Sequence, residues 1–267
     1  MKNLREYGIS DGEWIKHTSK LCGIAYTIDF PHSTSLALAI NELCFSYFNQ
    51  WRFVVDAYEK LATINSNLKD CNDQPITHSI LSNYDILASE SESSCRDYFY
   101  LMVTSMKSLL DLAACLIDVI VNQTIRPENA MVDIATVSKK LSKKNAPGVH
   151  QMMEGFLNKE QYPWIEVIKV TRNRLIHRGY TAKPKFGLNK SNEMIISLIK
   201  GNDHYTGGTI EVGSLFHNFI TGLYEMEEVI GACLLTSIPE LVHGQLVQAS
   251  YKTDGIIQHY SGTEINK

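Results

Sequence analysis

The sequence predicts an all-α protein, a helical bundle with a small β-hairpin or three-stranded flap inserted near residues 185–213. Three observations lead to this prediction. Long stretches without glycine or proline carry apolar residues three and four positions apart, which is the spacing of an amphipathic helix. One segment late in the chain changes to short β-favouring runs bounded by turn residues. No repeat of the length that marks a solenoid occurs, so we expect a single bundle.

The two longest helices are expected in the first half of the chain. Residues 33–64 have apolar or aromatic side chains at helical spacing, and Ser33 or Thr34 can cap their start. The polar segment 65–79 contains a Gln-Pro pair, which predicts a loop. A serine-rich and acidic stretch follows and can cap a second helix at 96–124, which is apolar nearly all round. Such a helix is expected at the centre of a bundle.

Shorter elements complete the prediction. Helices are expected at 130–142 and 148–158, separated by KKNAPG, and at 162–178, where Pro163 suits the first turn and Gly179 the position after the end. β-favouring runs occur at 194–199 and 209–212. Helical spacing returns from residue 214 to 237, before Pro239.

Composition bounds the organisation of the chain. With 267 residues, 44% of them apolar, we expect a single domain over 1–267, with a core bundle at about 33–238, an N-terminal extension at 1–32 and a weakly ordered C-terminal tail at 239–267. No apolar stretch reaches the roughly 18 residues of a membrane span, and the opening residues lack the apolar core of a signal peptide, so a cytoplasmic location without membrane contact is expected.

Cysteine and histidine spacing gives no sign of a metal site. The six cysteines form no C-x-x-C pair, and the nine histidines form no H-x(3)-H or H-E-x-x-H pair. We therefore expect buried thiols, no metal and no cofactor.

Positive charge is concentrated in one part of the chain. Residues 139–190 contain twelve lysines and arginines but three acids, although the whole chain has a net charge of −4. This segregation is typical of a surface that binds an anionic ligand. The segment could equally pair with acidic residues elsewhere in the fold, and charge alone leaves both interpretations open.

The end of the helix predicted at 162–178 combines unusual polar residues. Its apolar stripe is expected to face the core, with Arg172 at the edge of the stripe; the stripe contains Trp164, Val167, Ile168, Thr171 and Leu175. Lys169, Asn173 and His177 follow at four-residue spacing on another face, with Arg174 and Arg178 in the next column.

Favourable interaction with the helix dipole explains only part of this pattern. Cations at a helix C-terminus gain about 0.3–1 kcal/mol each, which accounts for one or two of them. The helix dipole does not account for four cationic side chains in a segment that has no acidic residue after Glu166. It also gives no reason for Asn173, because asparagine is a poor helix former. Arginine offers a fork of donors to phosphate, and histidine exchanges a proton near neutral pH. These residue types favour a phosphate-handling site.

The six residues Arg172-Asn173-Arg174-Leu175-Ile176-His177 resemble the R-x(4–6)-H signature of the HEPN superfamily, including the asparagine that often follows the arginine. HEPN domains are α-helical bundles, and many are metal-independent endoribonucleases of toxin–antitoxin, abortive-infection and other antiviral systems. The bundle-like region covers residues 33–238, whereas the specific match covers only these six residues. Some toxin-type members carry a tyrosine two residues after the histidine. Here Gly179 occupies that position and Tyr180 follows it, which argues against modification of such a tyrosine by an antitoxin.

The resemblance implies a specific set of roles. Arg172, Asn173 and His177 would be catalytic, and RNA cleavage would leave 2′,3′-cyclic phosphate ends. The nearby cations Lys169, Arg174 and Arg178 would bind RNA. Because one motif supplies one histidine and general acid–base cleavage needs two proton-transfer roles, we expect a homodimer through the motif-bearing helices. An antitoxin is a candidate partner.

Three functions remain open from the sequence. The first is a metal-independent endoribonuclease of the HEPN type, acting as a toxin or phage-defence effector. The second is a non-catalytic HEPN-like module that dimerises and binds RNA or a nucleotide. The third is a helical scaffold in which the motif is a coincidence.

Overall fold

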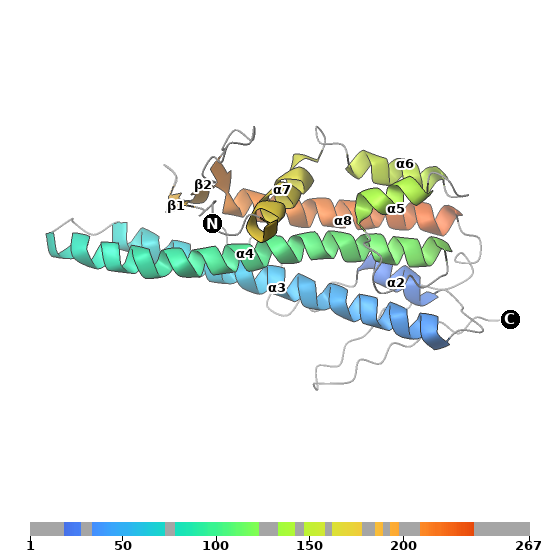
Figure 1. Cartoon of the computed structure of the whole chain (residues 1–267), viewed down its shortest axis with the longest axis horizontal. Helices are drawn as coiled ribbons and strands as arrows, with labels where there is room; N and C mark the ends of the chain where they lie inside the picture. The colour runs from blue at the N-terminus through green and yellow to red at the C-terminus, as the bar shows by residue number, and fades with distance from the viewer. Residues whose placement is uncertain are drawn as a thin grey trace. The chain divides into compact units, whose positions relative to one another are not determined.

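The structure, a computed structural model, describes residues 19–27, 34–72, 78–122, 133–141, 147–157, 162–177, 185–188, 193–197 and 209–237 (Figure 1). These residues are mostly α-helical and include one small antiparallel sheet. The predicted fold class, all-α with a small β insertion, is confirmed. The predicted C-terminal tail at 239–267 lies outside the described residues.

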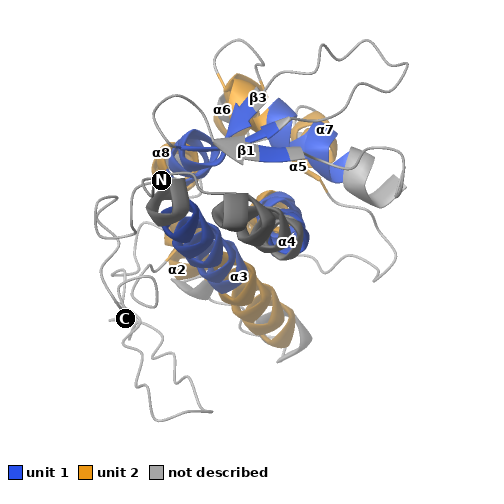
Figure 2. Cartoon of the chain, turned by 90° about the vertical axis from the view of Figure 1, so that its left-hand side faces the viewer, with its two compact units in different colours: residues 1–11, 52–107, 166–220 blue, residues 12–51, 108–165, 221–267 orange. Residues whose placement is uncertain are grey.

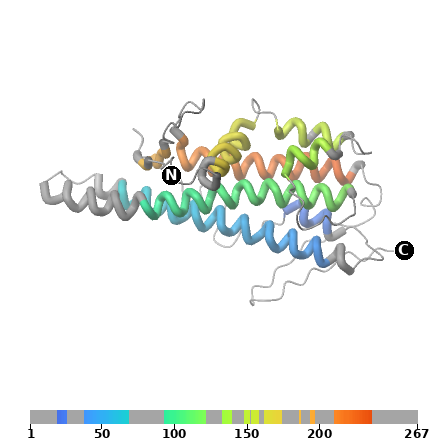
Figure 3. The backbone as a smooth tube through the Cα atoms, viewed as in Figure 1, coloured from blue at the N-terminus to red at the C-terminus, as the bar shows by residue number. Residues whose placement is uncertain are grey.

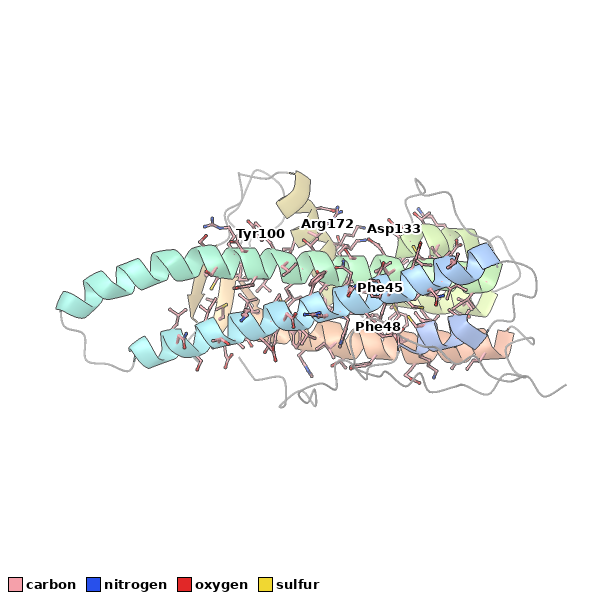
Figure 4. The ribbon with its side chains drawn as sticks, turned by 90° about the horizontal axis from the view of Figure 1, so that it is seen from below. Phe45, Phe48, Tyr100, Asp133 and Arg172 are labelled. Atoms are coloured by element: carbon pink, nitrogen blue, oxygen red, sulfur yellow. The ribbon has the colours of Figure 1, made fainter. Side chains whose placement is uncertain are left out.

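The helices follow one another along the chain as α2 (Lys20–Thr27), α3 (Thr34–Asn72), α4 (His78–Asn122), α5 (Ile134–Leu141), α6 (Pro147–Phe156), α7 (Pro163–His177) and α8 (Val212–Ser237). The four later helices begin and end within a few residues of the predicted bounds. Asp133, labelled in Figure 4, caps α5. Its Oδ1 accepts a hydrogen bond of 2.7 Å from the backbone N of Thr136. None of the described helices has the length and apolar character needed to cross a membrane.

The two long helices extend beyond their predicted ends. Helix α3 continues to Asn72, through most of the segment predicted as a loop, and α4 begins at His78 rather than near residue 96 (Figure 1). Figure 3 traces other parts of the same two helices, with α3 in blue and α4 in green. The predictions were wrong here because they treated polar composition as an end signal. No glycine or proline occurs from residue 33 to residue 73, nor from 78 to 124. Polar residues alone do not break a helix, so the first strong breaker after residue 33 is Pro75.

Helix α2 was not predicted. It lies within the segment expected as an N-terminal extension, yet Leu21 and Ile24 are fully buried. Ser19 precedes its first residue, and the hydroxyl oxygen of Ser19 accepts a hydrogen bond of 3.4 Å from the backbone N of Cys22. Eight residues with a central glycine are too few to show a periodic pattern, so the sequence did not predict this helix. Because Leu21 and Ile24 are buried, the core includes residues before 33.

The sheet has three strands in the order β1 (Lys185–Leu188), β2 (Met194–Ser197) and β3 (Thr209–Glu211). Both neighbouring pairs are antiparallel, with Lys185 opposite Ser197 and Ile195 opposite Glu211. Met194 and Ile196 are buried while Ile195 is half-buried, which is the alternation of a strand with one covered face. Of the two predicted forms, the three-stranded flap is the one that forms.

Contacts divide the chain into two compact units, each built from segments distant in the sequence (Figure 2). Unit 1 contains residues 1–11, 52–107 and 166–220. Its core includes Tyr58 of α3 stacked on Phe216 of α8, with ring centroids 3.7 Å apart. Phe99 of α4 meets Phe186 of β1 edge to face at 6.2 Å. Aromatic packing therefore joins α3 to α8, and α4 to the sheet, within this unit.

Unit 2 contains residues 12–51, 108–165 and 221–267. Trp51 of α3, which is 1% exposed, meets Tyr224 of α8 edge to face with centroids 6.0 Å apart. Trp164, at the start of α7, lies directly over Gly222 of α8. The close approach of α7 to α8 in unit 2 thus depends on a residue without a side chain at position 222.

Candidate functional site

Helix α7 carries the residues that resemble the HEPN motif. Pro163 occupies its first position, where a missing N–H has no cost, and Glu166 lies in the first turn, where a carboxylate interacts favourably with the helix dipole. Ile168 is fully buried and Thr171 is 1% exposed. The predicted apolar stripe therefore faces the core over this part of the helix, as helical spacing requires.

The structure brings two of the three predicted catalytic residues together. Arg172 is half-buried at the edge of the apolar stripe, and Asn173 is exposed. The Nη1 of Arg172 donates a hydrogen bond of 3.2 Å to Oδ1 of Asn173. Figure 4 marks the position of Arg172. Because the amide oxygen accepts this bond, the asparagine helps to orient the guanidinium group.

The structure describes only some of the other predicted site residues in full. Lys169, an expected RNA-binding residue, is exposed one helical turn before Asn173. His177 is the last residue of α7, so its backbone lies one turn after Asn173 on the same face of the helix. The side chains of Arg174 and His177, and the whole of Arg178, lie outside the described residues.

The arrangement of Arg172 and Asn173 suits an anionic ligand. Arginine carries five N–H donors in a planar fork that matches phosphate geometry. With Oδ1 of Asn173 engaged by Arg172, the amide NH₂ of the same side chain can donate in the opposite direction. Two neighbouring residues joined by one hydrogen bond therefore present donors near the C-terminal end of α7.

Sequence reasoning missed a buried polar cluster in unit 2. Glu227 of α8 is only 2% exposed, and its Oε2 accepts a hydrogen bond of 2.8 Å from the backbone N of Lys20. Its Oε1 accepts a hydrogen bond from the hydroxyl of Tyr47 on α3. The buried residues Leu223 and Ile230 lie four before and three after it on α8. An acid on an apolar helix face was the available signal, because a carboxylate there needs buried donors.

Burial changes the protonation of this cluster. Desolvation raises the pKa of Glu227 above its ordinary value of 4.5, although hydrogen bonds from Tyr47 and the backbone of Lys20 partly oppose the change. Desolvation also raises the pKa values of Tyr47, Cys22 and Tyr224, so these three groups stay neutral at neutral pH. Glu228 and Lys20 form an ion pair beside them, with Oε2 and Nζ 2.5 Å apart.

The raised pKa predicts how stability depends on pH. The folded state binds the Glu227 proton more tightly than the unfolded state, so its contribution is fully present below about pH 4.5 and is lost as pH rises through the folded pKa. Glutamine does not titrate, so Glu227→Gln should lack this pH-dependent contribution to stability. The unfolding free energy of the variant minus that of the wild type should therefore increase by up to about 1.4 kcal/mol for each pH unit in that window. Urea denaturation of both proteins between pH 4 and pH 8 measures the difference.

Glu228→Gln is the matched control for this prediction. Its side chain is 68% exposed, and its charge is the smallest of the causes that raise the pKa of Glu227, so its loss should change the pH dependence of stability much less than Glu227→Gln does. If the unfolding free energies of the wild type and Glu227→Gln changed with pH in parallel, the raised pKa of Glu227 would be contradicted.

A second polar group in unit 2 joins α5 to α6. The hydroxyl of Ser138, a fully buried residue, donates to Oε1 of Glu154 at 2.5 Å. Nδ1 of His150 lies 2.9 Å from the backbone oxygen of Ser138, which favours the tautomer with hydrogen on Nδ1. Because Ser138 is inaccessible to a substrate, these contacts hold two short helices together rather than form a nucleophilic site.

Neither a search for metal-binding clusters nor comparison with known proteins assigns a function. Among the described residues, no cluster of three or more histidine, cysteine, aspartate or glutamate side chains could hold a metal ion. No protein-family model, curated protein or solved structure matches the chain. The residues of α7 are therefore the basis for the function proposed below.

Proposed function

We propose that the protein is a metal-independent endoribonuclease of the HEPN type that acts as a toxin or phage-defence effector. The observation that carries the proposal is the hydrogen bond between Arg172 and Asn173 one turn before His177, at the end of α7. It supports the proposal because the arginine and the asparagine of the motif act as one oriented group of donors. The positive charge of residues 139–190 supports the choice of an anionic polymer as substrate.

The cleavage step needs two proton transfers and one group that binds the developing charge. A 2′-hydroxyl of the RNA attacks the adjacent phosphorus, the bond to the 5′-oxygen breaks, and a 2′,3′-cyclic phosphate and a 5′-hydroxyl result. His177 would accept or donate a proton, and Arg172 would bind the phosphoryl oxygens. Asn173 would hold Arg172 through Oδ1 and direct its amide NH₂ to a phosphoryl oxygen. Lys169, Arg174 and Arg178 would bind flanking phosphates.

The direct test is cleavage of mixed RNA by the purified full-length protein in EDTA, followed by analysis of the fragment ends. We expect cleavage without metal and fragments with cyclic phosphate and 5′-hydroxyl ends. A requirement for magnesium, or 5′-phosphate ends, would exclude this mechanism. RNA binding without cleavage would instead support a non-catalytic HEPN-like module that dimerises and binds RNA or a nucleotide.

The proposal includes a homodimer formed through the motif-bearing helices. One copy of the motif supplies one histidine, whereas general acid and general base are separate roles, so two copies of α7 would face a shared cleft. Light scattering is expected to give about twice the chain mass of 30.1 kDa. An isologous interface of this kind should bury on the order of 1,000 Å² or more. A mass of 30.1 kDa throughout the micromolar range would contradict the shared cleft.

A further inference from the structure

Helix α2 covers a buried carboxylate in unit 2, outside the proposed ribonuclease site. Glu227 of α8 is 2% exposed, and the backbone N of Lys20, the first residue of α2, donates to its Oε2 at 2.8 Å. The alkyl chain of Lys20 lies against Gly231 of α8, where a Cβ atom would come within 2.9 Å of its Cδ. The Nζ of Lys20 pairs with Glu228. Lys20 therefore joins the start of α2 to three residues of α8.

We propose that α2 is a pH-dependent strap, which leaves α3 and α8 when Glu227 loses its proton. A buried carboxylate must replace its water contacts with contacts from the protein, and a buried charge without an opposite charge is unfavourable. The donors to Glu227 are the hydroxyl of Tyr47 and the backbone amide of Lys20, and neither carries a charge. Movement of α2 would let water reach the ionised carboxylate.

Helix α2 is the element of this cluster that can move with the smallest loss of contacts. It has 8 residues, whereas α3 has 39 and α8 has 26. A helix of this length is not stable by itself in water, so its form depends on the packing of Leu21 and Ile24, which are fully buried. Helices α3 and α8 have their own contact in unit 2, between Trp51 and Tyr224, and can remain packed when α2 leaves.

The direction of the pH effect follows from the burial of Glu227. Burial raises its pKa, so the docked state binds the proton more tightly than a released state in which water reaches the carboxyl group. Docking of α2 is therefore strongest below about pH 4.5 and weakens as pH rises through the docked pKa. The equilibrium constant for release should increase by up to about tenfold for each pH unit in that window.

The neighbouring groups do not produce the same effect. Cys22 of α2, Tyr47 of α3 and Tyr224 of α8 face Glu227 from the three helices, and burial raises the pKa of each, so all three stay neutral in this window. Glu228 acts with the opposite sign, because its ion pair with Lys20 needs a charged carboxylate and therefore favours docking at higher pH. Release at higher pH thus identifies Glu227 as the responsible group.

The test is hydrogen exchange of the full-length protein between about pH 4 and pH 8, with each rate expressed relative to that of an unstructured chain at the same pH. The amide of Gly23 reports on α2, because it donates to the backbone oxygen of Ser19 at 2.9 Å. The amide of Lys20 reports on the contact with Glu227. We expect the protection of both amides to decrease with pH by up to about tenfold per unit and then to level off. The amide of Leu223 in α8 should stay more protected throughout.

Two variants separate Glu227 from its exposed neighbour. In Glu227→Gln the protection of α2 should no longer decrease with pH, whereas in Glu228→Gln it should still decrease, although α2 loses an ion pair. The proposal is overturned if protection of α2 in the wild type does not change with pH. It is also overturned if α2 and α8 lose protection equally, since the whole unit then unfolds, or if the decrease persists in Glu227→Gln. The wild-type measurement decides the matter even if Glu227→Gln does not fold.

Discussion

Replacing His177 with alanine is expected to abolish RNA cleavage, because the variant loses the group that transfers a proton in the proposed mechanism. Arg172→Ala should reduce the cleavage rate by a factor of roughly 10² to 10³, equivalent to about 2.7–4 kcal/mol, which is the effect of losing one donor to a developing oxyanion. Asn173→Ala should have a smaller effect, since it removes a hydrogen bond to Arg172 rather than the charge itself. Single-turnover cleavage of a defined RNA in EDTA measures the three losses.

The matched control is His217→Ala, which removes an exposed histidine of α8 that the mechanism does not use. Cleavage should be unchanged in this variant. Thermal unfolding of His177→Ala should show little loss of stability if the histidine lines a cleft, whereas a histidine with a satisfied hydrogen bond in the core should cost more than about 1 kcal/mol. Undiminished cleavage by His177→Ala would rule out the proposed role of this residue.

Gly222→Ala is expected to destabilise the protein by about 1–3 kcal/mol. A Cβ atom at this position would lie 2.4 Å from Cζ2 and 2.7 Å from Nε1 of the Trp164 indole. The indole is a rigid ring and Trp164 is only 6% exposed, so the ring and the start of α7 must shift to relieve the contact. The loss should occur although alanine is intrinsically the better helix former by about 1 kcal/mol.

Gly155→Ala on α6 provides the comparison for this prediction. Nothing lies within 4 Å of a Cβ atom built at Gly155, so the substitution should be neutral or stabilising by up to about 1 kcal/mol. Urea denaturation of both variants and the wild type measures the contrast. If Gly222→Ala were as stable as Gly155→Ala, the close approach of Trp164 to α8 would be contradicted.

Local signals in the sequence were sufficient to predict most of the elements. Pro163 marks the start of α7, and the return of helical spacing after the β-favouring runs marks α8. Helical spacing also predicted Arg172 at the edge of the buried stripe and Asn173 outside it, and the structure has both residues in these positions. These features could be predicted because a helix period, a proline and a short alternating run act within a few residues of one another.

Residue composition did not predict the lengths of α3 and α4. Their polar segments contain no glycine or proline, so the backbone can continue as helix where composition indicated a loop. Polarity indicates which faces meet water, whereas conformational breakers decide where helices end.

What the sequence determined by itself is the helical fold class, the small sheet and the amphipathic face of α7. Only the tertiary structure decided which residues become partners across long separations. Tyr47 and Glu227 are 180 positions apart, and Lys20 and Glu227 are 207 positions apart, yet hydrogen bonds join all three in one cluster. The physical reason is that a buried carboxylate or thiol takes its protonation from groups that the fold brings around it, and no local period records those groups.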